Sequence, residues 1–187
     1  MSQNLNETKT RNLFLSAQVN QESILNLSKA LIEINEHDRK TKKLFKIEGL
    51  KYTPKPIKIY IDTYGGNVYQ CFGLLGLMKS SITPIHTIVT GCAMSCGFMI
   101  AITGHKRFAY EKATLLYHQV SAGAFGKLKE IEEEVIEIKR LQKMIEDHTL
   151  AYTAISPETL ADCFDKKEDW YISVEEALKL KIIDKII

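Results

Sequence analysis

The sequence predicts an α/β domain with a mainly parallel sheet, because one order of elements occurs twice. At 57–61 apolar and polar residues alternate with a period of two, Gly65-Gly66 breaks the pattern, and helical periodicity follows from Val68. The same order of strand, glycine and apolar helix recurs at 85–102. Strands that alternate with helices favour parallel pairing through right-handed crossovers.

Length, composition and charge agree with one compact domain over 1–187. The chain has 187 residues, of which 45% are hydrophobic and 26% charged, and its net charge is +2. A net charge so close to zero supplies no attraction to nucleic acid or to anionic lipid, so we expect neither a nucleic-acid nor a membrane partner. No window approaches the ~18 apolar residues of a membrane-spanning helix.

The ends of the chain and its cysteines favour a cytoplasmic location. The first twelve residues are polar and lack the apolar segment of a secretory signal. The cysteines are irregularly spaced, at Cys71, Cys92, Cys96 and Cys163, with no histidine cluster beside them. This spacing predicts buried thiols in a reducing compartment and no metal site.

The N-terminal elements are a loose strand at 11–19 and a helix. The helix begins near Ser23, keeps its apolar residues on one face, and is predicted to end at His37. The segment 38–56 is rich in lysine and arginine and ends in Pro54-Lys55-Pro56, which predicts a basic surface insertion. It could bind nucleic acid, but a solvated loop is the favoured interpretation.

The C-terminal half contains the longest predicted helix, at 126–152. Two strands precede it, at 107–110 and 114–119, and a glycine-bearing link leads into it. At 1.5 Å per residue a helix of ~25 residues is about 37 Å long and would overhang a small domain. Its apolar stripe could pack on another subunit or on its own domain.

Three short elements complete the chain. Ser156-Pro157 predicts a helix to Phe164, Ser173 with Glu176 predicts a capping box, and a strand is expected at 181–187.

Ser95 is the candidate nucleophile. It lies among small residues between a strand and a buried helix, where helix N–H groups favour an anionic intermediate. The pattern differs from the Gly-x-Ser-x-Gly elbow because Ala93 stands at the first glycine position. On its own, a serine here is more often a helix N-cap than a nucleophile.

The other candidate groups are individually weak. His118 ends a strand, where a half-buried histidine bonded to backbone is ordinary, and His86 is its competitor as a base. Asp169 belongs to an acidic segment whose simplest interpretation is a solvated turn. Gly65-Gly66 could be a strand-ending turn with positive φ or a backbone that approaches substrate.

Taken together and in order, these motifs resemble the Clp protease proteolytic subunit family. They are the glycine turn at 60–68, the serine turn at 91–97, a Lys-Arg-Phe-Ala strand at 106–109, the strand end at 113–119 and the aspartate segment at 169–177. The resemblance runs from about Arg11 to the C-terminus. It implies a crotonase-like, ClpP-type α/β spiral of ββα units in which 126–152 is a long protruding handle helix.

The resemblance also implies a site and partners. Ser95 would be the nucleophile, His118 the general base and Asp169 the orienting carboxylate. The N–H groups of Gly66 and Cys96 would form the oxyanion hole, and the Gly65-Gly66 edge would hold an extended peptide. The subunit would need no cofactor or metal, and would form a homo-oligomer of heptameric rings, single or stacked as a tetradecamer, that receives unfolded polypeptides from an AAA+ ATPase.

Several positions depart from the family's pattern, and other functions stay open. The proline usual before the two glycines is Tyr64, and Cys92, Cys96 and Val120 replace other residues near the site. Lys167-Glu168 stands where an Asp-Arg pair often couples the rings. The alternatives are an ATPase-independent relative, such as a phage prohead maturation protease or a signal-peptide peptidase, a non-catalytic ring subunit, and a crotonase-type acyl-CoA enzyme.

Overall fold

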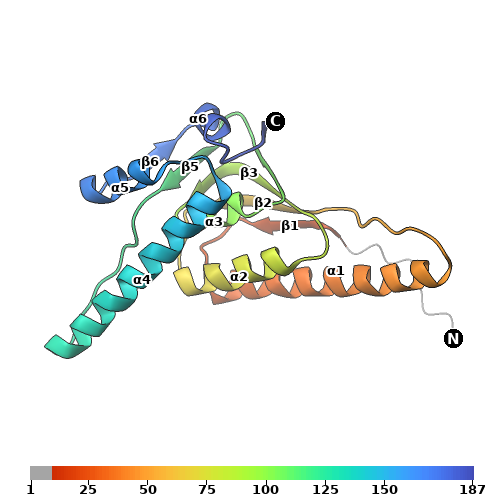
Figure 1. Cartoon of the computed structure of the whole chain (residues 1–187), viewed down its shortest axis with the longest axis horizontal. Coiled ribbons are helices and arrows are strands. Elements are labelled where there is room, and N and C mark those ends of the chain that lie inside the picture. Colours follow the sequence, from red (N-terminus) through yellow and green to blue (C-terminus); the bar gives the residue numbers. More distant parts are fainter. Residues whose placement is uncertain (1–9) are drawn as a thin grey trace.

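A seven-stranded sheet forms the centre of the structure, a computed structural model that describes residues 10–187 (Figure 1). The strands are β1 (Asn12–Leu15), β2 (Ile57–Thr63), β3 (Ile85–Met94), β4 (Lys106–Ala109), β5 (Thr114–Tyr117), β6 (Trp170–Ile172) and β7 (Lys185–Ile186). The helices are α1 (Gln21–Ile47), α2 (Val68–Ser80), α3 (Cys96–Ile102), α4 (Leu128–Tyr152), α5 (Pro157–Lys166) and α6 (Val174–Lys179).

The sheet is parallel except at one edge, which confirms the predicted fold class. Its main path is β1-β2-β3-β4-β7, and all four pairings are parallel. The long strand β3 pairs with β4 through 86–89 and with β5 through 92–94, and β5 pairs with β6 in antiparallel orientation. Because β2 and β3 are parallel neighbours, the turns after their carboxyl ends lie side by side.

The helix α1 continues past its predicted end at His37 and includes 38–47. The expectation of a loop from Asp38 is therefore wrong for the first half of the basic segment, although its lysines are exposed or half-buried. Asp38 is 1% exposed and ends the buried stripe of α1. Lysine and arginine are good helix formers, so a basic composition alone does not stop a helix.

A cluster of hydrogen bonds holds Asp38 inside the domain. Arg11 donates to both of its carboxylate oxygens at 2.8 and 2.6 Å, and the hydroxyls of Tyr52 and Thr83 each donate at 2.6 Å. Burial alone would raise the pKa of Asp38, but these hydrogen bonds lower it from 3.8 to about 2. The Asp38 cluster thus joins α1, β1, the return segment 48–56 and the turn before β3.

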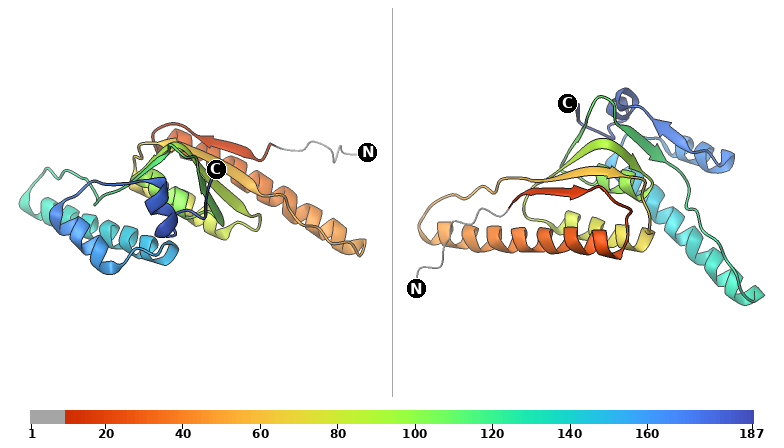
Figure 2. Two further views of the ribbon diagram at one scale, coloured as in Figure 1. Left: turned by 90° about the horizontal axis from the view of Figure 1, so that it is seen from above. Right: turned by 180° about the vertical axis from the view of Figure 1, so that it is seen from behind.

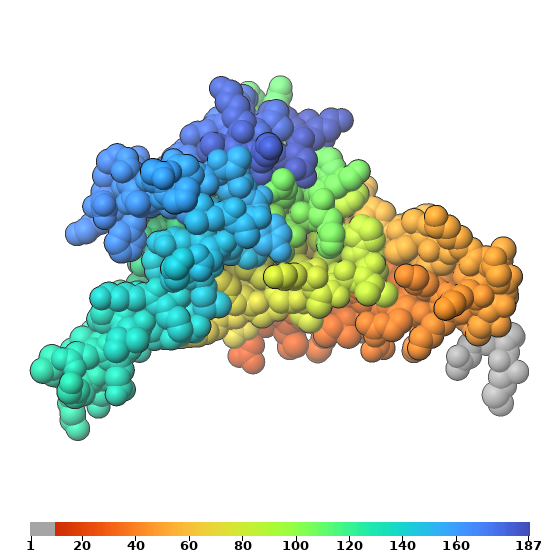
Figure 3. Space-filling view, in the orientation of Figure 1, coloured from red at the N-terminus to blue at the C-terminus, as the bar shows by residue number. Residues whose placement is uncertain are grey.

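The helix α4 has the predicted length and overhangs the domain. Its buried residues, Leu141, Gln142, Ile145 and Thr149, all lie in its second half. The first half projects away from the sheet, on the side opposite to the far end of α1 (Figures 2 and 3).

The elements after α4 begin at the predicted serine caps, but the capping box predicted for Ser173 with Glu176 has only its Ser173 half. Ser156 caps α5 and Ser173 caps α6, each by accepting from the N–H three residues later. The final strand is shorter than expected, at Lys185–Ile186. The added strand β6 comes directly after Asp169, where the sequence suggested an acidic turn.

Candidate active site

Ser95 lies on a sharp turn between β3 and α3. Its backbone has φ 53° and ψ −118°, an uncommon conformation for a residue with a side chain. It stands at the N-cap position of α3, yet its side chain makes no capping hydrogen bond. The interpretation of Ser95 as an N-cap is therefore confirmed for its position but not for its hydroxyl, which caps no N–H group of α3.

The turn after β2 packs against Ser95, and only glycine fits there. Gly65 has φ 98°, and a Cβ on it would lie 2.8 Å from the Cβ of Ser95 and 2.7 Å from the carbonyl oxygen of Met94. Gly66 has φ 149°. The predicted need for positive φ at both glycines is confirmed, and the reason at Gly65 is the close approach of Ser95.

The peptide group of Gly66 faces away from the N-terminal segment. Val19 forms a parallel bridge with Gly66, in which Val19 N–H donates to Gly65 and Asn67 N–H donates to Val19, both at 2.8 Å. In such a bridge the N–H of the central residue, Gly66, points to the opposite side. One edge of the glycine turn is thus occupied by Val19, and the N–H and carbonyl of Gly66 lie on the other edge, where the carbonyl accepts from the thiol of Cys96 at 3.3 Å.

Four of the predicted site residues line one cavity of about 180 Å³. They are Gly66, Ser95, Cys96 and His118. Ser95 N–H donates to the carbonyl of Leu116 at 3.0 Å, which fixes the serine turn to the strand that ends beside His118. Cys96 is the first residue of α3, so its N–H has no partner within the helix.

His118 and Ser95 share this cavity without a hydrogen bond between them. His118 is half-buried and directly follows β5. Both side chains border the same cavity, but they make no hydrogen bond to each other, which proton transfer between them requires.

Asp169 is placed by strand pairing. It is exposed, does not line the cavity, and makes no hydrogen bond to His118. The register between β5 and β6 pairs Tyr117 with Trp170, so continuing it by one residue sets Asp169 opposite His118. Opposed residues of an antiparallel pair have Cα atoms about 4.5 to 5.5 Å apart, which is within side-chain reach.

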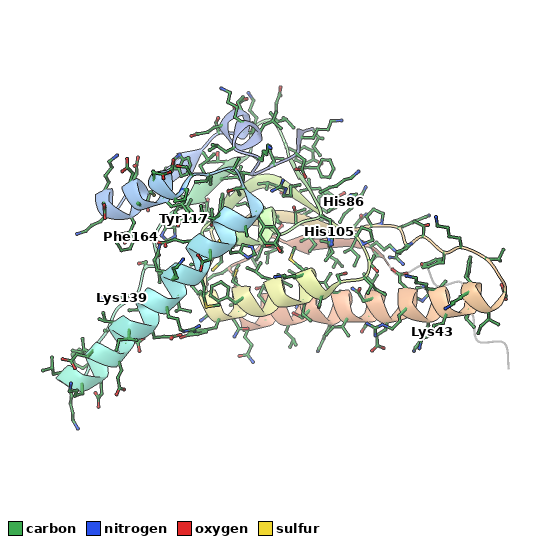
Figure 4. The ribbon with its side chains drawn as sticks, in the orientation of Figure 1. Lys43, His86, His105, Tyr117, Lys139 and Phe164 are labelled. Atoms are coloured by element: carbon green, nitrogen blue, oxygen red, sulfur yellow. The ribbon has the colours of Figure 1, made fainter. Side chains whose placement is uncertain are left out.

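His86, the competing base, lies elsewhere. Its ring packs beside Phe108 at a centroid distance of 5.7 Å, in a groove that also contains Tyr60 and Ile187. Figure 4 shows His86 on the other side of the domain from Tyr117, which lines the Ser95 cavity. His118 is therefore the histidine that the fold brings to Ser95.

The apolar walls of the Ser95 cavity are not predicted by the sequence. Val68, Met99, Val120 and Ile145 line it together with Tyr117. Helical periodicity identifies Met99 and Ile145 as core residues, but it carries no signal that they border a site. The contribution of Ile145 comes from the buried half of α4, which packs on α3.

Two broader features bear on the class of protein. Within residues 10–187, no cluster of three or more histidine, cysteine or acidic side chains is arranged to hold a metal ion. No helix in the same range is both long and apolar enough to cross a bilayer.

Known proteins of one family match this chain. The family model described as Clp protease matches residues 6–187. The chain is also 33% identical over 133 residues to an ATP-dependent Clp protease proteolytic subunit of Deinococcus radiodurans; the match covers 70% of this chain and 64% of that relative, somewhat less than two thirds of its length. The strand-to-helix serine turn, the glycine turn beside it and a family match over nearly the whole chain lead to one conclusion: this chain belongs to the Clp protease family and has its α/β fold.

Proposed function

We propose that this chain is a serine endopeptidase, the proteolytic subunit of an ATP-dependent Clp-type protease. The observation that carries the proposal is Ser95: a strained serine that caps no helix and shares a cavity with His118 and with the N–H groups of Gly66 and Cys96. A nucleophile, a base and two oxyanion donors are the minimum set for cleaving an amide through an acyl-enzyme.

Each group has a defined part in the reaction. His118 takes the proton of Ser95 as Oγ attacks the peptide carbonyl carbon, and Gly66 and Cys96 N–H groups donate to the resulting oxyanion. His118 then gives the proton to the leaving amine as the C–N bond breaks. Water hydrolyses the acyl-enzyme by the same steps, and Asp169 keeps the imidazole in the required orientation.

The shape of the site suggests how a peptide binds. Gly65-Gly66 would add a peptide strand at the edge that Val19 leaves free. The apolar walls of the cavity favour an apolar side chain on the acyl side of the cleaved bond.

The wider arrangement belongs to the same proposal. The exposed first half of α4 includes Leu128, Val135 and Ile136, and a second subunit would cover them. We propose heptameric rings, single or stacked, that enclose the active sites and receive unfolded polypeptides from an AAA+ ATPase. Assembly would also bring Ser95, His118 and Asp169 into hydrogen-bonding alignment.

The serine assignment is tested with a fluorophosphonate probe. We expect one covalent adduct at Ser95, and Ser95→Ala should abolish both labelling and peptide hydrolysis. Ser121 lines the same cavity, so Ser121→Ala is the matched control and should keep both. Labelling that survives in Ser95→Ala would overturn the assignment.

The assembly is tested by native mass spectrometry with and without a partner ATPase. A mass of seven or fourteen subunits is expected for rings of this family type. Monomers alone under every condition would contradict the ring proposal while leaving the serine assignment to the probe experiment.

A further inference from the structure

Two buried thiols meet directly behind the proposed oxyanion hole. Cys71 lies on α2 and Cys96 begins α3, and they are 1% and 3% exposed. The thiol of Cys71 donates to the carbonyl of Cys96 at 3.6 Å, and the thiol of Cys96 donates to the carbonyl of Gly66 at 3.3 Å. The pair therefore joins α2, the serine turn and the glycine turn.

The two thiols differ in acidity and in access. A hydrogen bond between them raises the pKa of Cys71, with burial adding to the rise, and the same hydrogen bond lowers the pKa of Cys96. Cys96 also lines the Ser95 cavity, whereas Cys71 lies behind it. Cys96 is thus the more acidic of the two thiols and the one that borders a cavity open to a small reagent.

We propose that Cys71 and Cys96 form a dithiol site that hydrogen peroxide converts into a disulfide. The Cys96 thiolate attacks one peroxide oxygen, the O–O bond breaks, and the products are a Cys96 sulfenic acid and hydroxide. The Cys71 thiol then attacks the sulfur of Cys96, the S–O bond breaks, and water leaves with the Cys71 proton. The two sulfurs are oxidised and the peroxide is reduced.

The disulfide would change the geometry of the neighbouring oxyanion hole. Its formation removes the thiol hydrogen that Cys96 donates to Gly66 and pulls Cys96 toward α2. Gly66 and Cys96 are the two proposed oxyanion donors, so oxidation would lower peptide hydrolysis and a reductant would restore it. This consequence, unlike the disulfide itself, rests on the proposed function.

The other two cysteines provide matched comparisons. Burial raises the pKa of Cys92, and so does its neighbour Asp62. Burial and Glu168 raise the pKa of Cys163, whose thiol donates to the carbonyl of Glu168 at 3.3 Å. The pKa is raised at both Cys92 and Cys163 and lowered at Cys96, so neither of the two is expected to react first.

Peptide mapping of the full chain after treatment with hydrogen peroxide tests the site. The expected product is a peptide pair crosslinked through Cys71 and Cys96, about 2 Da lighter than the two thiol peptides, that dithiothreitol separates. Cys71→Ser should prevent the crosslink and leave a Cys96 sulfenic acid that dimedone traps. Cys163→Ser should behave as wild type. A crosslink through Cys92, or no crosslink with both thiols still open to alkylation, would overturn the proposal.

Two activity readouts separate this proposal from the proposed function. If the crosslink forms and peptide hydrolysis is unchanged, the dithiol site stands and the oxyanion role of Cys96 is refuted. If no crosslink forms while Ser95 still reacts with fluorophosphonate, the dithiol site is refuted and the serine assignment stands.

Discussion

The two long helices overhang the domain in opposite ways. α1 has 27 residues and α4 has 25, and each projects past the sheet. The projecting part of α1 is contacted by the return segment 48–56. Tyr52 of that segment packs on Phe45, with ring centroids 5.3 Å apart, and donates a hydrogen bond to Asp38. The overhang of α4 is held mainly by pairs along its own surface and by one hydrogen bond from Tyr69 to Glu137.

The difference shows two ways in which a domain can cover the apolar residues of an amphipathic helix that extends beyond it. α1 is held from within at Asp38, a buried carboxylate that gathers partners from three other parts of the chain, although Ile47 at the end of α1 is 82% exposed. The apolar residues in the first half of α4 stay uncovered, and Ile136 is 68% exposed. Another copy of the chain is the simplest partner that could cover them. The predictions below test this contrast, beginning with the largest expected effect on stability.

Asp38→Ala should remove the anchor of α1. The substitution leaves the half-buried Arg11 guanidinium without its carboxylate and two hydroxyls without their acceptor. We expect the free energy of unfolding, measured by urea titration, to fall by about 3 to 5 kcal/mol. The exposed Asp165→Ala is the control and should change it by less than about 0.5 kcal/mol. A loss below about 1 kcal/mol for Asp38→Ala would mean that the cluster does not hold α1.

Lowering the pH should weaken the contacts of His148 on α4 before it weakens the Asp38 cluster on α1. His148 stacks on Tyr152 at 4.4 Å and lies 2.8 Å from the hydroxyl of Thr103; burial, with a smaller effect of Lys79, lowers the pKa of His148 from 6.5 to about 4. A folded-state pKa below the unfolded value means that stability is full above pH 6.5 and falls as pH decreases toward 4. We expect a loss of roughly 2 kcal/mol over this window, after allowance for solvent screening at a half-buried ring.

The contribution of Asp38 is lost in the same direction, but in a window at lower pH. Its folded pKa of about 2 lies below 3.8, so its stabilisation is complete above about pH 4 and is lost only between pH 4 and 2. Urea titrations at pH 7 and pH 5 separate the two groups, because only the His148 contribution to the free energy of unfolding changes between these pH values. His148→Gln should flatten the change between them and His37→Gln should not. An unchanged slope in His148→Gln would contradict the assignment.

Tyr117→Phe should strengthen the contact beneath α4. Among the described residues, the hydroxyl of Tyr117 is a buried polar atom without a hydrogen-bond partner, in contrast to the fully paired Asp38. Removing it should raise the free energy of unfolding by about 1 kcal/mol, read from the urea midpoint. Tyr60→Phe, at a half-buried ring stacked on Phe14, serves as the comparison and should be near neutral. Destabilisation by Tyr117→Phe would show that the hydroxyl has a partner in solution.

Ile136→Ser should have the smallest effect on folding and still change assembly. The side chain is exposed on the open half of α4, so the free energy of unfolding of dilute protein should shift by less than about 0.5 kcal/mol. Sedimentation velocity should show that Ile136→Ser lacks the larger species that the proposed assembly predicts for the wild type. Lys139→Ser, on the same helix, should leave that species intact. Equal sedimentation of Ile136→Ser and wild type would place the subunit contact elsewhere.

Much of the site could be predicted from the sequence, because its parts are local. Ser95 stands out by the small residues around it, and Gly65-Gly66 by the end of an alternating strand. The order of the motifs then indicated the family. The strand β6 was missed although Trp170, Tyr171 and Ile172 are typical strand residues, because the acidic residues before them favoured a turn.

The sequence by itself determined the class of fold, the long helix α4 and the choice of Ser95 as the candidate nucleophile, because periodicity and glycine placement report on one segment at a time. Only the tertiary structure decided which distant groups meet. It buried Asp38 with Arg11, paired Tyr117 with Trp170 so that His118 and Asp169 follow and precede paired strands, and placed Cys71 against Cys96. A polar side chain acquires its partners only when segments far apart in the chain pack together, and no local pattern records that choice.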